Sequence, residues 1–354
     1  MDFRRKEDSL TGYYSQHIIV ENRKESAVMS VPYSSKIFGL VPWYSFLIVT
    51  GAAIAIILAV REERRTELKK DTVIDFALWV LPAGIIGARL YYVIFSWKDF
   101  KDDLLSVFRI WEGGIAIYGA VIAGLLTAFI FSRKRKISFL TLCDMIAPGL
   151  ILAQAIGRWG NYFNQECYGL IVENPSLQFF PFAVQIPGGN GLEWHMATFF
   201  YESFWNLIVF VFLMIARRKW FRCRGDVISF YAFCYACGRL IIEDFRTDSL
   251  YASSSIRISQ LLSVLICLFL LLRYFLLFRK RSAVFSLPAC IIGVIAAAAD
   301  FFLIVWLSGL VTLSAAVWIR FVVLLGGSMI NLLALFVLYS TCAEGEIIYA
   351  GVKG

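Results

Sequence analysis

The chain has 354 residues, of which 59% are hydrophobic and 17% are charged, with a formal net charge of +8. Its mean hydropathy of +0.71 excludes a soluble domain of this length, whose surface would need more polar side chains to face water. The composition therefore predicts a polytopic membrane protein. The positive charge fits an anionic bilayer surface, and we expect no nucleic-acid partner.

Nine apolar runs of about 20 residues are each long enough to cross a bilayer. Because these runs are continuously apolar instead of alternating, they predict helices and not barrel strands. The predicted fold class is therefore all-α, a polytopic bundle of membrane helices. The predicted spans are 40–60, 73–96, 113–131, 138–157, 198–216, 226–245, 258–278, 286–308 and 315–341.

The loops between the predicted spans differ in basic charge. The first 36 residues are polar and mixed in charge, so we expect no cleavable signal peptide. Alternate loops hold 17 Lys and Arg residues, against six in the loops between them. By the positive-inside rule the basic loops face the cytoplasm, and the N-terminus lies outside. The basic loops are 61–71, 132–137, 217–225 and 279–281.

Charged residues inside membrane spans indicate a functional site, because placing them in lipid is costly. One such group lies in the stretch YACGRLIIEDFRTD, where helical spacing predicts a single polar face. An internal Arg239–Glu243 salt bridge would neutralise two charges of this face, and Arg246 would leave it positive. The residues of the face are Tyr235, Arg239, Glu243 and Arg246.

The stretch GRWGNYFNQE follows directly on the fourth span and brings Arg158 to the outer end of that span. The planar fork of Arg grips a phosphate with two hydrogen bonds and keeps its charge. Arg158 together with Arg239 and Arg246 therefore predicts a site for an anionic lipid headgroup. A simpler interpretation is that Arg158 snorkels to the interface while the asparagines cap the helix, which explains single residues better than the cluster.

Two glycine-containing stretches place further polar residues in spans. In IWEGGIAIYG, the hydroxyl of Tyr118 needs a hydrogen-bond partner. Arginines nearby could lower its pKa enough for general-base catalysis. Alternatively, Tyr118 could simply hydrogen-bond a neighbouring helix. In PAGIIGARLYY, Arg89 needs a carboxylate or phosphate nearby. With only two histidines and no Cys/His cluster at ligand spacing, we expect no metal and no cofactor. The segment 158–197 predicts an apolar loop on the membrane surface.

The stretches GRWGNYFNQECYG, IWEGGIAIYGAVIAG, TFFYES and GRLIIEDFR together resemble the prolipoprotein diacylglyceryl transferases of bacteria, from about residue 40 to 278. The resemblance implies a seven-span transferase core at 37–280, two extra spans in 281–354 and a polar extension at 1–36. It implies that phosphatidylglycerol donates its diacylglyceryl group to the lipobox cysteine of a preprolipoprotein. A thioether would form and glycerol-1-phosphate would leave, at the bacterial cytoplasmic membrane.

The resemblance also implies roles for individual residues. Arg158 and Arg239 match the two arginines that neutralise the phosphate, and Glu202 matches the carboxylate of the TFFYES stretch. The family position at Tyr118 is His in many members, so the proton acceptor for the thiol stays open among Tyr118, Glu202 and water. The predicted catalytic residues are Arg158, Arg239, Tyr118 and Glu202. The predicted substrate-binding residues are Arg158, Asn161, Glu166, Gly169, Tyr44, Arg89, Glu243 and Arg246.

Two other interpretations come from different functional classes. A lipid or anion transporter would also place arginines and glycines in a bundle, but it predicts internal repeats, and the sequence has none. An inactive, lipid-binding scaffold is disfavoured because both arginines and the whole GRWGNYFNQE stretch are retained. In the two extra spans, Asp300 and Arg320 are predicted to pair with each other.

Overall fold

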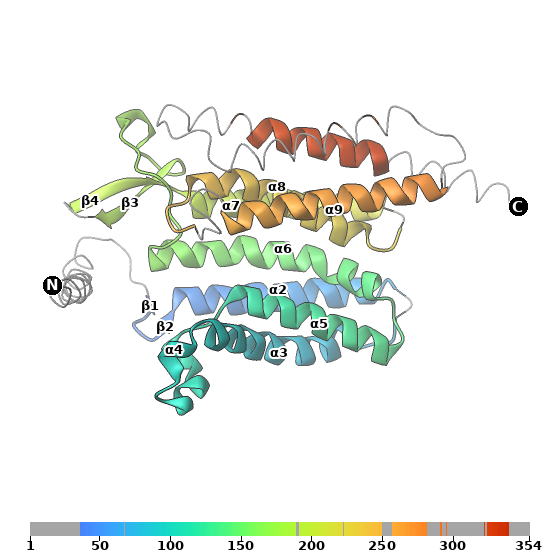
Figure 1. Ribbon diagram of the computed structural model, residues 1–354, viewed down its shortest axis with the longest axis horizontal. Coiled ribbons are helices and arrows are strands. Elements are labelled where there is room, and N and C mark those ends of the chain that lie inside the picture. The colour runs from blue at the N-terminus through green and yellow to red at the C-terminus, as the bar shows by residue number, and fades with distance from the viewer. Residues whose placement is uncertain are drawn as a thin grey trace, which may run out of the picture.

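The computed structural model describes residues 36–66, 68–188, 191–221, 223–249, 257–281, 291, 295, 322 and 324–339. Long helices run side by side along one axis (Figure 1). Among the described residues, six helices are long and apolar enough to cross a membrane. Many large apolar side chains on them are exposed, such as Leu78 and Ile86, as expected for surfaces that face lipid. The predicted fold class, an all-α polytopic membrane bundle, is confirmed.

Seven helices correspond to the first seven predicted spans. They are α2 (Trp43–Glu63), α3 (Thr72–Phe95), α5 (Ile117–Arg135), α6 (Phe139–Asn164), α7 (Thr198–Lys219), α8 (Asp226–Ile242) and α9 (Ile258–Arg281). A further helix at Leu324–Tyr339 overlaps the ninth predicted span. The eighth, 286–308, lies outside the described residues except for 291 and 295, and so does the predicted pair of Asp300 and Arg320.

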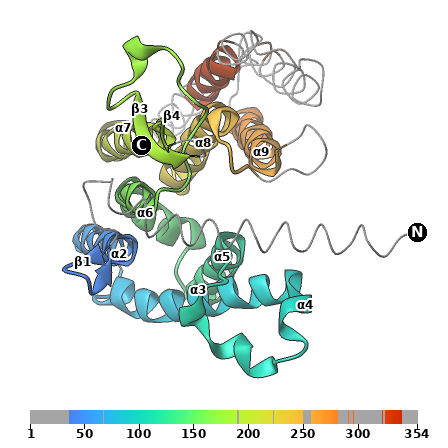
Figure 2. The same ribbon diagram turned by 90° about the vertical axis from the view of Figure 1, so that its left-hand side faces the viewer.

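Helix α6 is the centre of the bundle, with α2 and α5 on one side and α7 and α8 on the other (Figure 2). Its backbone comes so close to α2 that a Cβ on Gly149 would lie 2.8 Å from the Cα of Ala55, so only glycine permits this packing. The helix ends where Gln165 adopts a left-handed conformation and the Glu166 N–H donates to the Asn161 carbonyl. This central helix carries most of the GRWGNYFNQE stretch.

The connections alternate between the two ends of the bundle. The short loops from α2 to α3, α5 to α6 and α7 to α8, which are the basic ones, gather at one end, at the right in Figure 1. At this end the Asp144 carboxylate accepts from the backbone N–H groups of Gly225 (2.5 Å) and Ile228 (2.9 Å), which caps α8. Within the described residues, these basic loops therefore lie at the end opposite the non-basic segments 97–112 and 165–197, as their alternation along the chain predicts.

The opposite end of the bundle, which we call the site end, carries the irregular structure. It contains β1 (Lys36–Ile37), β2 (Val41–Pro42), α4 (Trp97–Phe100), η1 (Leu104–Phe108), η2 (Ile110–Glu112), η3 (Pro175–Leu177), β3 (Ala183–Gly188), β4 (Gly191–Met196) and η4 (Glu243–Phe245). The strands β3 and β4 form an antiparallel hairpin that projects beyond the helices (Figure 1). The prediction that 158–197 is a loop was wrong in two respects: α6 continues to Asn164, and this hairpin follows it.

Candidate active site

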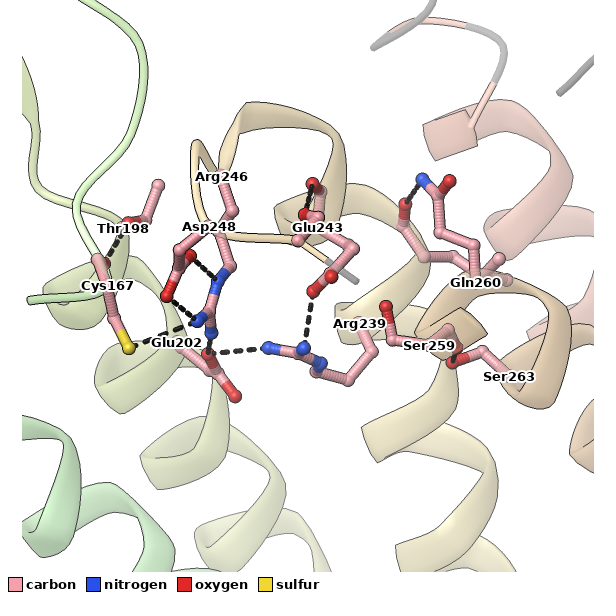
Figure 3. Close-up of polar contacts among 12 residues, drawn as sticks. Cys167, Thr198, Glu202, Arg239, Glu243, Arg246, Asp248, Ser259, Gln260 and Ser263 are labelled. Atoms are coloured by element: carbon pink, nitrogen blue, oxygen red, sulfur yellow. Dashed lines mark hydrogen bonds and ion pairs between the residues drawn. The ribbon is translucent and has the colours of Figure 1, made fainter. Parts of the chain in front are cut away.

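The Glu202 carboxylate is the centre of an ionic cluster at the site end. It lies on the second turn of α7 with a side-chain exposure of only 3%. One carboxylate oxygen is 2.5 Å from Nη2 of Arg158 on α6. The other is 3.1 Å from Nη1 of Arg239 on α8 and 3.9 Å from Nη1 of Arg246 (Figure 3). One buried acid thus gathers three guanidinium groups from three segments of the chain.

Two of the three arginines have a second carboxylate. Arg239 donates to Glu243 one turn further along, so the predicted salt bridge is confirmed. Arg246 donates from Nε and Nη2 to the two oxygens of Asp248, at 2.9 and 2.7 Å. Burial alone would lower the pKa of Arg246, but the hydrogen bonds to Asp248 and the charges of Cys167, Asp248 and Glu243 together raise it. We call these six residues the arginine cluster: Arg158, Arg239, Arg246, Glu202, Glu243 and Asp248.

The charges of the arginine cluster balance, with three cations against three carboxylates. The expectation that Arg246 leaves a net positive face was therefore wrong, because Asp248 pairs with it. Arg158 is the most exposed of the three arginines, with 22% of its side chain accessible. This guanidinium is consequently the one best placed to meet an incoming anion.

The backbone at Arg246 departs from the helical face that its spacing predicts. Helix α8 ends at Ile242, η4 follows, and Arg246 is extended, paired in a β-bridge with Gly169. A Cβ on Gly169 would lie 2.8 Å from side-chain atoms of Met196 and Thr198, so glycine is required there. The contact of Gly169 with Arg246 is therefore made by its backbone.

Residues 157–164 of the GRWGNYFNQE stretch form the last turns of α6, so Arg158 lies inside the helix. Its amide residues converge on one acid, because Asn161 and Asn164 donate to Oε1 of Glu166 at 2.9 and 3.2 Å. Tyr44, at the start of α2, packs its ring against Gly160. The structure thus brings Tyr44, Asn161 and Glu166 to the same end of α6 as Arg158.

A half-buried thiol beside the cluster was missed by sequence reasoning. Sγ of Cys167 lies 3.0 Å from Nη2 of Arg246, and the Cys167 carbonyl accepts from Thr198 at 2.6 Å (Figure 3). Burial raises the pKa of this thiol to about 11, although Arg246 acts to lower it. Asp248 was also missed. The sequence pointed to Asp248 only through its position two residues after Arg246. It pointed to Cys167 only through its position directly after the GRWGNYFNQE stretch.

Arg89 lies apart from the arginine cluster, on α3, and is 7% exposed. Its guanidinium donates to backbone carbonyls, so the partner that the sequence analysis expected, a carboxylate or phosphate, is replaced by peptide oxygens. This arrangement fixes the segment between α4 and α5. The carbonyls are those of Ser106 (2.7 Å), Val107 (2.9 Å), Gly113 (2.6 Å) and Gly114 (2.7 Å).

Tyr118 occupies the first turn of α5, where its ring centroid lies 6.3 Å from that of Tyr91 on α3. In the part of the chain that the structure describes, no hydrogen bond joins Tyr118 to the arginine cluster. The structure therefore brings together Arg158, Arg239, Arg246, Glu202 and Glu243 but leaves Tyr118 and Arg89 outside that group.

Comparisons with known proteins identify the family of the chain. A family model described as prolipoprotein diacylglyceryl transferase matches residues 32–276. Three curated relatives bear the name phosphatidylglycerol–prolipoprotein diacylglyceryl transferase. The protein of Enterococcus faecalis is 48% identical over 65% of this chain and 84% of its own length. The protein of Streptococcus suis is 42% identical over 70% of this chain and 91% of its own length. The protein of Listeria monocytogenes is 45% identical over 64% of this chain and 82% of its own length. The chain belongs to the prolipoprotein diacylglyceryl transferase family.

Proposed function

We propose that this chain transfers the diacylglyceryl group of phosphatidylglycerol to the cysteine thiol of a prolipoprotein. The observation that carries the proposal is the convergence of Arg158, Arg239 and Arg246 on one buried carboxylate at the site end. A phosphodiester needs fixed cations that hold it and stabilise its charge as it leaves, and guanidinium groups meet that need. The family match and the relatives' names support the same activity.

The reaction is a displacement at carbon. The acceptor sulfur forms a bond to the glycerol carbon of the donor, while the bond from that carbon to the phosphate oxygen breaks. Glycerol-1-phosphate leaves with the electron pair, and a proton leaves the thiol. Arg158 and Arg239 bind the phosphate and neutralise the charge that develops on the leaving oxygen. No cofactor is needed for this balance.

Glu202 acts as a positioning residue in this proposal, because its two oxygens hold three guanidinium groups in place. The proton of the acceptor thiol passes to water, since the carboxylate is engaged and Tyr118 packs near Tyr91 instead of the cluster. Tyr44, Asn161, Glu166 and Gly169 support the substrate-binding end of α6, and Arg89 shapes the segment that precedes α5.

The orientation of the chain follows from its basic loops, which gather at the end opposite the arginine cluster. With those loops in the cytoplasm, the cluster faces the outer leaflet of the bacterial cytoplasmic membrane and the N-terminus lies outside. Phosphatidylglycerol then reaches the cluster from the lipid, and the lipobox peptide, tethered in the same membrane, meets it there.

The proposal is tested with the purified full chain in phosphatidylglycerol-containing nanodiscs and a lipobox peptide, with the thioether product read by mass spectrometry. We expect product from the wild type and a large loss in Arg158→Ala and in Arg239→Ala. The matched control is Arg257→Ala, which removes another arginine with low exposure, paired with Asp244 at 2.6 Å, outside the cluster. Absence of product from folded wild type would refute the activity, and full activity in both variants would refute the site.

A further inference from the structure

A second layer of polar side chains lies below the arginine cluster. Asn206 on α7 is fully buried, and neither its amide nitrogen nor its amide oxygen has a hydrogen-bond partner among the described residues. On α6, the side-chain oxygen of Gln154 is buried and likewise unpartnered within that part of the chain. The Gln154 side chain lies beside the hydroxyl of Tyr231 on α8. Buried polar atoms are nearly always satisfied, so this layer indicates a missing polar group.

The helical register places this layer one turn from the cluster on all three helices. Asn206 follows Glu202 by four residues, and Gln154 precedes Arg158 by four. Since α6 runs towards the site end and α7 runs away from it, both steps lead in the same direction, into the bundle (Figure 1). Each step is a rise of about 6 Å. On α8, Tyr235 precedes Arg239 by four residues, and its ring stacks on that of Tyr231, a further turn away from the cluster.

We propose that Asn206 forms a subsite for the acyl-ester group of the lipid donor, with its amide donating to an ester carbonyl. This inference rests on the proposed function. The esters of a phospholipid follow the phosphate along one glycerol backbone and lie deeper in the bilayer. A lipid whose phosphate is held by Arg158 therefore carries its carbonyls towards the layer below. An ester carbonyl only accepts hydrogen bonds, so the unpaired donor is the Asn206 amide.

The subsite also predicts which lipid donor the chain prefers. A site built around an unsatisfied buried donor discriminates against an analogue that lacks the acceptor. The donor preferred by this chain is then a diacyl lipid, and a dialkyl ether of the same headgroup and chain length fits the same space without its carbonyls.

The test compares diacyl phosphatidylglycerol with its dialkyl-ether analogue in the purified full chain. Transfer kinetics and equilibrium lipid binding, read by native mass spectrometry, are measured for wild type and Asn206→Leu. We expect the wild type to prefer the ester by roughly tenfold in kcat/KM and in binding. Asn206→Leu should bring the ratio close to one, chiefly by raising KM for the ester. The matched control is Gln260→Leu, a buried amide on α9 that donates to the Leu240 carbonyl at 3.1 Å.

Three results would overturn the inference. The wild type could bind and use both lipids equally, or Asn206→Leu could weaken both lipids equally. The third outcome is that Asn206 binds only a water molecule. An unchanged ester-to-ether ratio together with a lower melting temperature in Asn206→Leu would show this. Gln154→Met is a second variant: because the unpaired Gln154 atom is an acceptor, which cannot bond an ester carbonyl, the ratio should stay close to that of the wild type. Absence of product from the wild type with either lipid would count against the proposed function, and the binding ratio would still decide the subsite.

Discussion

Neutralising Glu202 tests the organisation of the arginine cluster most directly. Glu202→Gln keeps the shape of the side chain but removes the charge that three guanidinium groups share, at 2.5, 3.1 and 3.9 Å. Breaking a buried ion pair from one side costs about 3–5 kcal/mol. Because Arg239 and Arg246 keep Glu243 and Asp248, we expect the lower limit, about 3 kcal/mol of unfolding free energy.

The same variant should bind the released phosphate more tightly while it turns over more slowly. Its cluster carries one net positive charge, so we expect the affinity for glycerol-1-phosphate to rise about tenfold, which corresponds to about 1.4 kcal/mol. Denaturant unfolding in micelles and isothermal titration measure the two quantities. Glu243→Gln is the comparison, since that acid pairs with Arg239 alone within the cluster. Wild-type stability combined with unchanged product affinity in Glu202→Gln would show that the carboxylate does not organise the arginines.

Three further predictions concern other parts of the chain. Asp144→Ala leaves two backbone N–H groups at the start of α8 without their acceptor, and should lower the unfolding free energy by about 2 kcal/mol in a denaturation experiment; an unchanged curve would contradict the capping role. Burial raises the thiol pKa of Cys167 to about 11, so the thiolate becomes appreciable only as the pH approaches that value. Maleimide should therefore label Cys167 in the folded chain far more slowly than in the unfolded chain at pH 8, as peptide mass spectrometry can check; equal rates would disprove its burial. Tyr118→Phe should keep transfer activity within about tenfold of the wild type, with the same pH profile, because water accepts the thiol proton; a loss near the upper end for a general base, about 10⁴-fold, would return that role to Tyr118.

The sequence predicts the spans well where apolar runs coincide with helices. The span 198–216 begins at the residue where α7 begins, and 40–60 is shifted by three residues from α2. The end of α6 was missed because hydropathy measures the cost of facing lipid. Arg158 and Asn161 face partners inside the bundle instead, so the helix continues through them.

The site was predictable where its contacts are local. The pair of Arg239 and Glu243 follows from a spacing of four residues on one helix. The pairing of Arg158 with Glu202 joins residues 44 positions apart, and it depends on how α6 packs against α7. No periodicity encodes that packing, and the same holds for the bridge between Gly169 and Arg246.

The balanced charge of the arginine cluster bears on how the enzyme sheds its product. An unoccupied cluster with three cations and three carboxylates has no excess charge to hold an anion from solution. A phosphodiester lipid brings one negative charge, whereas a phosphate monoester carries about −1.5 to −2 at neutral pH. The site with bound product is therefore more negative than the site with bound lipid donor. The carboxylates that pair with the arginines then repel the product. Electrostatic repulsion would then drive release of the product, with no moving lid required.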